Sequence, residues 1–159
     1  MDRGEHLMEA LWDMMNKKRV LDQTELRTIS EELNTTELRC IEYVGRNTNV
    51  NATRLAEAFY MTTGAASKLT KKLLAKGLVS RYQKLENRKE VYFRLTEEGE
   101  SLFEAVSALR ERLSNRDAAI FDELTPEQYD TILRFVGRYS DHLDHAGRRP
   151  ERRVPYTGR

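Results

Sequence analysis

Hydrophobic residues recur along most of this chain with the three-to-four-residue period of amphipathic helices. The first such stretch, about His6 to Ser30, has apolar side chains at helical spacing: Leu7, Met8, Leu11, Trp12 and Met15. Asn34 can cap a second helix, and Glu37 three residues later completes a variant of the capping box. We expect this second helix to end near Gly45.

Two shorter helical segments follow a polar turn at residues 46–49. Asn51 can cap the first segment, whose inward positions are Leu55, Ala56 and Phe59. Residues 63–76 then resume the helical period with Ala66, Leu69 and Leu73 on one face, and Gly77 stands where a C-terminal cap belongs. Beyond Gly77 the period changes to two. Residues 78–85 and 90–95 therefore predict a β-hairpin whose loop is residues 86–89.

The C-terminal part of the chain again has helical periodicity. Thr96 can cap a long helix that continues through Phe121, and residues 125–128 have the threonine, proline and glutamine of a capping box for one more helix. The apolar positions of this last helix have coiled-coil-like spacing: Tyr129, Ile132, Val136, Tyr139 and Leu143. Residues 147–159 offer almost nothing to bury, so we expect a disordered basic tail.

This order of elements predicts a mainly α fold with a small β-hairpin wing, an α+β winged helix-turn-helix with dimerisation helices at both ends. The expected boundaries are residues 1–33 for the N-terminal dimerisation helix, 34–96 for the winged helix-turn-helix, 97–146 for the C-terminal dimerisation helices and 147–159 for the tail. The terminal helices have more apolar positions than one small domain can cover, which favours a homodimer. The alternative is that these helices fold back on their own domain.

The net charge of +1 conceals a separation of sign along the chain. Residues 61–95 hold nine basic and two acidic residues, a net charge of +7, and residues 148–159 add +4, so the remainder carries −10. A compact basic segment within an acidic remainder is what a phosphate-binding surface requires. The alternative is an ordinary solvated helix face.

In a winged helix-turn-helix, the second helix of the motif enters the major groove of DNA. The outward side chains of residues 63–76 are hydroxyls and lysines, which can bind phosphate oxygens or base edges. We expect residues 86–89, with Arg88 foremost, to reach the minor groove. The complete expected set of DNA-contacting residues is Thr53, Thr62, Thr63, Gly64, Ser67, Lys68, Lys71, Lys72, Arg88 and Lys89.

With these segments in place, the sequence resembles the MarR family of bacterial regulators. The resemblance extends over roughly residues 33–102, through "LNTTELRCIEYV", "NATRLAEAFYMTTGAASKLTKKLLAKGLVSRYQ" and "ENRKEVYFRLTEEG". The recognition-helix hydroxyl and cation of the family fall on Ser67 and Lys68, and its wing arginine falls on Arg88. The chain departs from the family pattern at Glu86-Asn87, where an aspartate commonly precedes the wing arginine, and in having lysines where arginines are common on the recognition helix.

The resemblance implies a homodimeric regulator that binds a pseudo-palindromic operator in double-stranded DNA, with repression as the commoner mode. It also implies a small aromatic or lipophilic effector. The candidate lining is Trp12, Met15, Tyr43 and Phe59, although aromatic and methionine side chains at helical spacing are more often plain core. The rival function is a winged-helix module that binds protein partners in place of DNA, and the basic segment argues against it.

Other features narrow the function further. The chain has neither a membrane-spanning apolar run nor an apolar signal core after its charged start, so we expect a cytoplasmic protein. Its single cysteine, Cys40, could sense oxidants but is expected to be an inert buried thiol. His142 and His145, each beside an aspartate, are weak evidence for a metal, and no metal or cofactor is expected. No catalytic motif is present, so we do not expect an enzyme.

Overall fold

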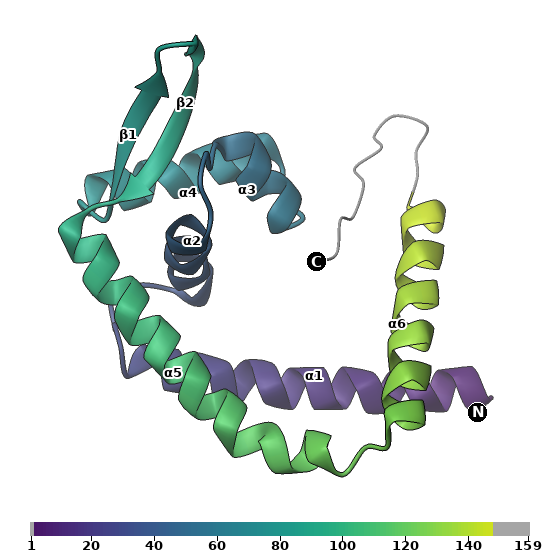
Figure 1. The fold of residues 1–159 in the computed structure, drawn as a ribbon. Coiled ribbons are helices and arrows are strands. Elements are labelled where there is room, and N and C mark those ends of the chain that lie inside the picture. Colours follow the sequence, from purple (N-terminus) through teal and green to yellow (C-terminus); the bar gives the residue numbers. More distant parts are fainter. Residues whose placement is uncertain (1, 148–159) are drawn as a thin grey trace. The chain divides into compact units, whose positions relative to one another are not determined.

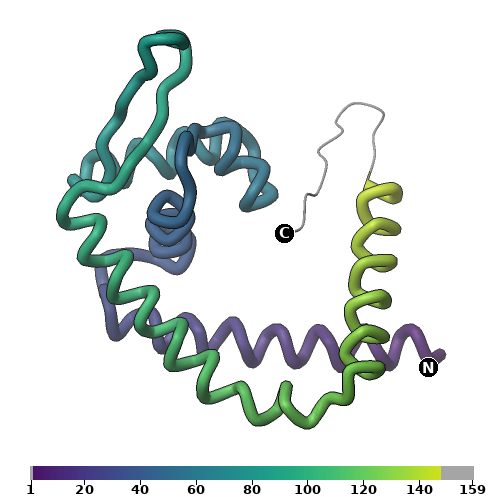
Figure 2. Tube along the Cα trace, viewed as in Figure 1, coloured from purple at the N-terminus to yellow at the C-terminus, as the bar shows by residue number. Residues whose placement is uncertain are grey.

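The computed structural model describes residues 2–147, which form six helices and one hairpin (Figures 1 and 2). In chain order the elements are α1 (Arg3–Arg27), α2 (Thr35–Arg46), α3 (Ala52–Ala58), α4 (Thr63–Ala75), β1 (Val79–Lys84), β2 (Asn87–Leu95), α5 (Glu97–Asp122) and α6 (Pro126–Ala146). The predicted α+β class, mainly helical with one antiparallel hairpin, is confirmed. The tail predicted for residues 147–159 lies, from residue 148 onward, outside the described residues.

The chain divides into two compact units, Met1–Glu111 and a second unit that begins at Arg112. The first unit contains α1 to α4, the hairpin and the first part of α5. The second unit contains the rest of α5 and α6. The four-part division expected from the sequence places its boundaries elsewhere and stays a prediction.

Side chains at the helix starts satisfy backbone N–H groups that have no partner within the helix. At the start of α2, the Asn34 side chain accepts from the Glu37 N–H, and the Glu37 carboxylate accepts from the Asn34 N–H. Thr125 and Gln128 make the same reciprocal pair at the start of α6. Both predicted capping boxes are therefore present.

The hydrophobic core of the first unit is built from α2, α3, α4 and α5. Its largest fully buried side chains are Leu38, Cys40, Ile41, Val50, Leu55, Leu73, Val106 and Leu109. The helical period predicted the inward faces of α2, α3 and α4. Phe59 is only half-buried, because it is the C-cap residue of α3 and lies where that helix leaves the core.

Two close backbone approaches connect α5 to the rest of the first unit. A Cβ added to Gly45 on α2 would overlap the Phe103 ring of α5, and a Cβ added to Gly99 on α5 would overlap the Leu78 carbonyl oxygen. Gly77, with a φ of 69°, turns the chain from α4 into β1, a left-handed conformation that favours glycine. Glycine at these three positions therefore fixes how α4, β1 and α5 meet.

The hairpin pairs β1 with β2 in antiparallel register and projects from the helices of the first unit (Figure 1). Val79 is opposite Leu95, Tyr82 is opposite Tyr92, and the register shifts between Tyr82 and Lys84. The predicted loop at residues 86–89 is wrong: the turn is at residues 85–86, and β2 begins at Asn87. The register shift near the tip lets Asn87 pair with Lys84, so the polar residues after the turn extend the strand.

The helices at the two ends of the chain bury few side chains. Leu26 is the only buried residue of α1, and Trp12 and Met15 remain 71% and 63% exposed. No residue of α6 is buried, and its predicted seam is mostly exposed, with Ile132 and Val136 at 47% and 53%. Across residues 2–147, none of the helices has the length and apolar character needed to span a membrane.

Candidate nucleic-acid interface

The recognition helix α4 is capped at its start and held to the core along one face. The Thr62 side chain accepts from the Ala65 N–H at 3.1 Å, and Ala66, Leu69 and Leu73 are buried. The opposite face is open. Its exposed residues are Thr63, Gly64, Lys68, Lys71 and Lys72, and Ser67 is half-buried at the edge of that face. The structure thus brings six of the predicted DNA-contacting residues to one side of one helix.

Six cations in this part of the chain have no anionic partner among residues 2–147 and are exposed to solvent. They are Lys68, Lys71 and Lys72 on α4, Arg81 on β1, and Arg88 and Lys89 on β2. Unpaired ammonium and guanidinium groups on one helix and one hairpin are suited to polyanion binding, because binding releases the counterions of the phosphates. This set excludes three basic residues of the same segment, which have partners within the chain.

Lys76 is one of these three, and its side chain contacts residues of the first unit at the end of α4. Its Nζ lies 3.2 Å from the Glu37 carboxylate and donates to the Glu32 carbonyl oxygen at 3.1 Å. Glu37 has only 3% of its surface exposed. Lys76 is the C-cap residue of α4, so its side chain returns toward the loop between α1 and α2. It therefore ties the end of the recognition helix to the start of α2.

The other two, Lys84 and Arg94, cover aromatic rings of the hairpin. The rings of Tyr82 and Tyr92 lie opposite each other with centroids 5.5 Å apart. Lys84 Nζ lies 5.1 Å from the Tyr92 centroid, and the Arg94 guanidinium lies 5.6 Å from the Tyr82 centroid. Cross-strand aromatic and cation–π contacts of this kind each contribute about 0.5–1 kcal/mol at exposed sites. They stiffen the hairpin that carries Arg88.

Side chains near the wing tip hold the backbone on either side of Arg88. Gln83 Nε2 donates to the Arg88 carbonyl oxygen at 2.8 Å, and the Lys89 N–H donates to Asn87 Oδ1 at 3.2 Å. Both hydrogen bonds leave the Arg88 side chain exposed. Because β2 starts at Asn87, Arg88 lies on a paired strand, and its position is set by the hairpin register.

The base of the wing is held by residues that sequence reasoning did not identify as part of the site. The Phe93 N–H donates to the Val50 carbonyl oxygen at 2.8 Å, which adds a β-bridge between the wing and the loop before α3. Asn51 Nδ2 donates to the Glu90 carboxylate at 3.1 Å. The sequence predicts Asn51 only as a helix cap, and no local pattern indicates its second partner, which is 39 residues away.

Thr53 and Tyr60 are exposed residues of α3 and of the turn between α3 and α4. Thr53 is exposed on α3, as expected for a contact outside the recognition helix. Tyr60 lies in the turn between α3 and α4 with a φ of 52° and is 84% exposed. A non-glycine residue in this left-handed region is uncommon. The sequence pattern predicts only a connection at Tyr60 and Met61 and does not single out Tyr60 as a functional residue.

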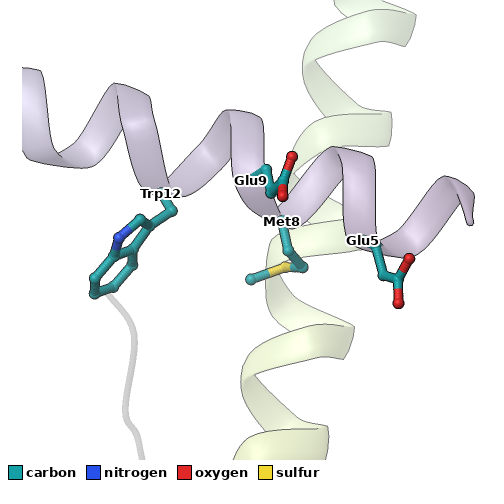
Figure 3. A pocket seen from close by; sticks show the side chains of 4 residues that line it. All are labelled: Glu5, Met8, Glu9 and Trp12. Carbon is teal, nitrogen blue, oxygen red and sulfur yellow. The ribbon is translucent and has the colours of Figure 1, made fainter. Parts of the chain in front are cut away.

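The four predicted effector-lining residues are not gathered in one cavity. Trp12 lines a shallow depression on one side of α1 together with Glu5, Met8 and Glu9 (Figure 3). Tyr43 and Phe59 contact each other elsewhere, with ring centroids 5.7 Å apart. A role for Trp12, Met15, Tyr43 and Phe59 in ligand binding stays a prediction.

Cys40 is a buried free thiol, and the C-terminal histidines belong to no cluster of three metal-ligating side chains in the described residues. The Cys40 side chain is fully buried, and burial raises the pKa of its thiol to about 12. His145 Nδ1 lies 2.6 Å from the Asp141 carbonyl oxygen. Among residues 2–147, no three His, Cys, Asp or Glu side chains are grouped so that they could hold a metal ion.

Comparison with known proteins gives matches over the same region. Residues 33–91 match the sequence profile of the MarR family. The chain is 35% identical over 97 residues to an uncharacterised HTH-type transcriptional regulator of Bacillus subtilis, YhjH, a match that covers 61% of this chain and 55% of YhjH. It is 24% identical over 111 residues to the HTH-type transcriptional regulator PchR of the same organism, which covers 70% of this chain and 66% of PchR. The chain therefore matches less than two thirds of the length of these two relatives.

The fold has counterparts among solved structures. The FabT protein of Streptococcus pneumoniae, solved in complex with DNA, superposes with a TM-score of 0.74 at 17% sequence identity, covering 89% of this chain and 98% of FabT. This likeness concerns the fold. The profile match covers α2 to α4 and most of the hairpin, the elements that carry the six unpaired cations. The part of the chain that resembles the MarR family in sequence is therefore residues 33–91, which form most of the winged helix-turn-helix.

Proposed function

We propose that this chain is a transcriptional regulator that binds double-stranded DNA through α4 and the hairpin. The observation that carries the proposal is the set of six exposed cations on α4, β1 and β2, none of which is neutralised by another described residue. The family match supports it, because the relatives are named as HTH-type transcriptional regulators, and FabT was solved in complex with DNA.

In the proposed complex α4 lies in the major groove and Arg88 reaches the adjacent minor groove. The start of α4 presents Thr62, Thr63 and Gly64 to the duplex, and the absence of a Cβ at Gly64 allows the backbone to approach a phosphate. Ser67, Lys68 and Lys71 follow along the exposed face. Lysine is a point charge without the planar fork of arginine, so sequence discrimination is spread over several contacts.

The proposed regulator is a homodimer. What supports this is the apolar surface that each chain leaves exposed: Trp12 and Met15 on α1, and Ile132 and Val136 on α6, are 47–71% exposed. Exposed apolar stripes of this kind normally find a partner. A dimer also presents two recognition helices to a pseudo-palindromic operator. Val136→Glu should shift the chain toward the monomer in sedimentation equilibrium, whereas Asp144→Ala, at an exposed polar position of the same helix, should not.

The DNA-binding proposal is tested with a duplex selected by the wild-type protein from a randomised library. Affinities are measured by fluorescence anisotropy for Lys68→Ala and Arg88→Ala, with Lys17→Ala on α1 as the matched control. We expect each of the first two substitutions to cost about 1–3 kcal/mol of binding free energy and the control to cost nothing measurable. If selection enriches no sequence, or if both substitutions bind as tightly as the wild type, the proposal is wrong and a protein-binding module becomes the better hypothesis.

Repression, a cytoplasmic location and release by a small aromatic or lipophilic effector complete the proposed function. These finer points are supported by the family match alone. An effector would be detected as a compound that lowers the affinity for the selected duplex, and Tyr43→Ala and Phe59→Ala would test whether the aromatic pair takes part in its binding.

A further inference from the structure

Glu42 is a buried carboxylate that connects α2 to α5. Only 8% of its surface is exposed, although it is charged. One of its oxygens accepts from Arg110 Nε of α5 at 2.5 Å, and the other lies 2.9 Å from Arg46 Nη2, one turn further along α2. The two arginines remain half-exposed, with 43% and 56% of their side-chain surface accessible.

The same two helices also contact each other one turn from Glu42. Gly45 lies against the Phe103 ring so closely that a Cβ would overlap it. Phe103 and Arg110 are seven residues apart on α5, so they lie on the same face, two turns from each other. The crossing of α2 and α5 is therefore held at two points, by an aromatic ring against a glycine and by an ion pair between Glu42 and Arg110.

Fully buried apolar side chains lie on the same two helices as the ion pair. Val106 and Leu109 of α5 and Ile41 of α2 are fully buried and supply the apolar contacts of this region. Buried ion pairs add little net stability, because removing both charges from water costs about as much as their attraction gains. What the Glu42–Arg110 pair can supply is a defined geometry, because sliding or rotating α5 along α2 would remove the cation from one carboxylate oxygen and leave Glu42 paired with Arg46 alone.

We propose that Glu42 is a positioning residue which, through Arg110, sets how the two recognition helices of the dimer are spaced on DNA. The proposal rests on the proposed function. α2 belongs to the winged domain, and its crossing with α5 lies within the first unit, whereas the proposed dimer contacts are on α1 and α6. Within the first unit, the α2–α5 crossing thus fixes the direction of α5, the helix that connects the winged domain to α6 along the chain.

The proposal predicts different effects on two affinities: that for a single half-site and that for two half-sites bound at once. Binding of one winged domain to one half-site depends on α4 and the hairpin, which Glu42 does not touch. Simultaneous binding of two half-sites depends on how rigidly the two domains are held, and preorganised bivalency can raise affinity by about 10²–10⁴-fold over a single site. Loosening the α2–α5 crossing should reduce this gain in affinity for two half-sites and leave the affinity for a single half-site unchanged.

Three substitutions distinguish the effect of the ion pair between α2 and α5 from the effect of the Glu42 charge alone. Glu42→Gln removes the carboxylate and keeps the shape of the side chain. Arg110→Met removes only the partner on α5 and keeps an apolar stem, and Arg110→Lys restores a cation. Arg46→Met is the matched control, because Arg46 pairs with the same carboxylate from within α2 and cannot fix the crossing of two helices.

The assay uses the palindromic duplex selected by the wild type, a duplex holding one of its half-sites, and a palindrome with one base pair inserted at its centre. The insertion moves one half-site by about 3.4 Å and turns it by about 34°. We expect Glu42→Gln and Arg110→Met to weaken binding to the palindrome by about tenfold. The ratio of the affinity for the palindrome to the affinity for the duplex with the inserted base pair should also fall. Arg46→Met should behave as the wild type, and Arg110→Lys should recover part of the loss.

Four outcomes would overturn the inference. An equal loss on the half-site and the palindrome would mean that Glu42 only supports the winged domain. Unchanged binding by the folded variants, with folding checked by circular dichroism, would mean that the pair sets no geometry. An Arg46→Met effect equal to that of Arg110→Met would assign the role to the charge and not to the crossing. If the wild type bound no duplex with sequence preference, the proposed function would fail first, independently of the variants.

Discussion

Lys68 and Lys76 lie on or next to the same helix, yet the structure predicts opposite consequences when each is replaced by methionine. Lys68 is exposed without an ion pair among the described residues, whereas Lys76 neutralises the buried Glu37 carboxylate. Methionine keeps a long apolar side chain in both cases and removes only the charge. Lys76→Met should therefore lower the stability, and Lys68→Met should lower the affinity for DNA.

The magnitudes follow from burial. Removing one partner of a fully buried pair costs about 3–5 kcal/mol. Here the Lys76 side chain is 36% exposed while that of Glu37 is 5% exposed, so solvent screens part of the interaction. The Glu37 carboxylate would also keep its hydrogen bond from the Asn34 N–H. A loss of about 1–2 kcal/mol is the expected effect of Lys76→Met. Glu37→Gln keeps an acceptor for the capping box and should cost less, about 1 kcal/mol.

Urea unfolding measures the first effect and salt titration of DNA binding measures the second. Lys76→Met should lower the unfolding midpoint without a change in the m-value. Its plot of log affinity against log salt concentration should keep the slope of the wild type. Lys68→Met should leave the unfolding free energy within about 0.5 kcal/mol of the wild type and reduce the salt slope by about 0.9. The reasoning is refuted if Lys76→Met reduces the slope as much as Lys68→Met does.

Four further predictions concern the core and the supports of the interface. Native protein should react with Ellman's reagent at Cys40 only as fast as it unfolds, because its pKa of about 12 keeps the thiol protonated. The neutral thiol stabilises the fold fully below the ordinary thiol pKa of 9.0, so this contribution should be lost as the pH rises from there toward 12, which urea titrations across that range would detect. Gly45→Val should destabilise by about 1–3 kcal/mol in thermal unfolding, since its side chain would overlap the Phe103 ring, while Gly137→Val, where the space is open, should not produce this steric loss. Thr62→Ala should cost about 1 kcal/mol of stability, because it removes the acceptor that caps α4; Thr63→Ala, at an exposed position that is not the cap, is the control.

Local signals predicted most of the fold because the chemistry of each helix start and stop lies within a few residues. The capping residues Asn34 and Thr125, and the change of period after Gly77, are examples. The wing tip was misplaced because the register is set by pairing between strands: Lys84 lies opposite Asn87, and this pairing moves the turn to residues 85–86. Composition in the loop could not distinguish these registers.

The exposed face of α4 could be predicted from periodicity, but the roles of individual charges could not. Lys76 and Lys72 are both lysines near the end of the helix, and only tertiary packing brings Glu37 to one of them. Glu42 was unremarkable in the sequence for the same reason, because its partner Arg110 is 68 residues away. Charge counts identify a basic segment, and contacts between distant segments decide which of its members are available to DNA.

Lysine acetylation footprinting, with and without a saturating amount of the selected duplex, tests the central claim most directly. Mass spectrometry reads each lysine separately, so the contacts of α4 and the wing are observed without any substitution. We predict that Lys68, Lys71, Lys72 and Lys89 become protected in the complex while Lys17 and Lys18 on α1 react as before. Equal modification of the four interface lysines in free and bound protein would contradict the account.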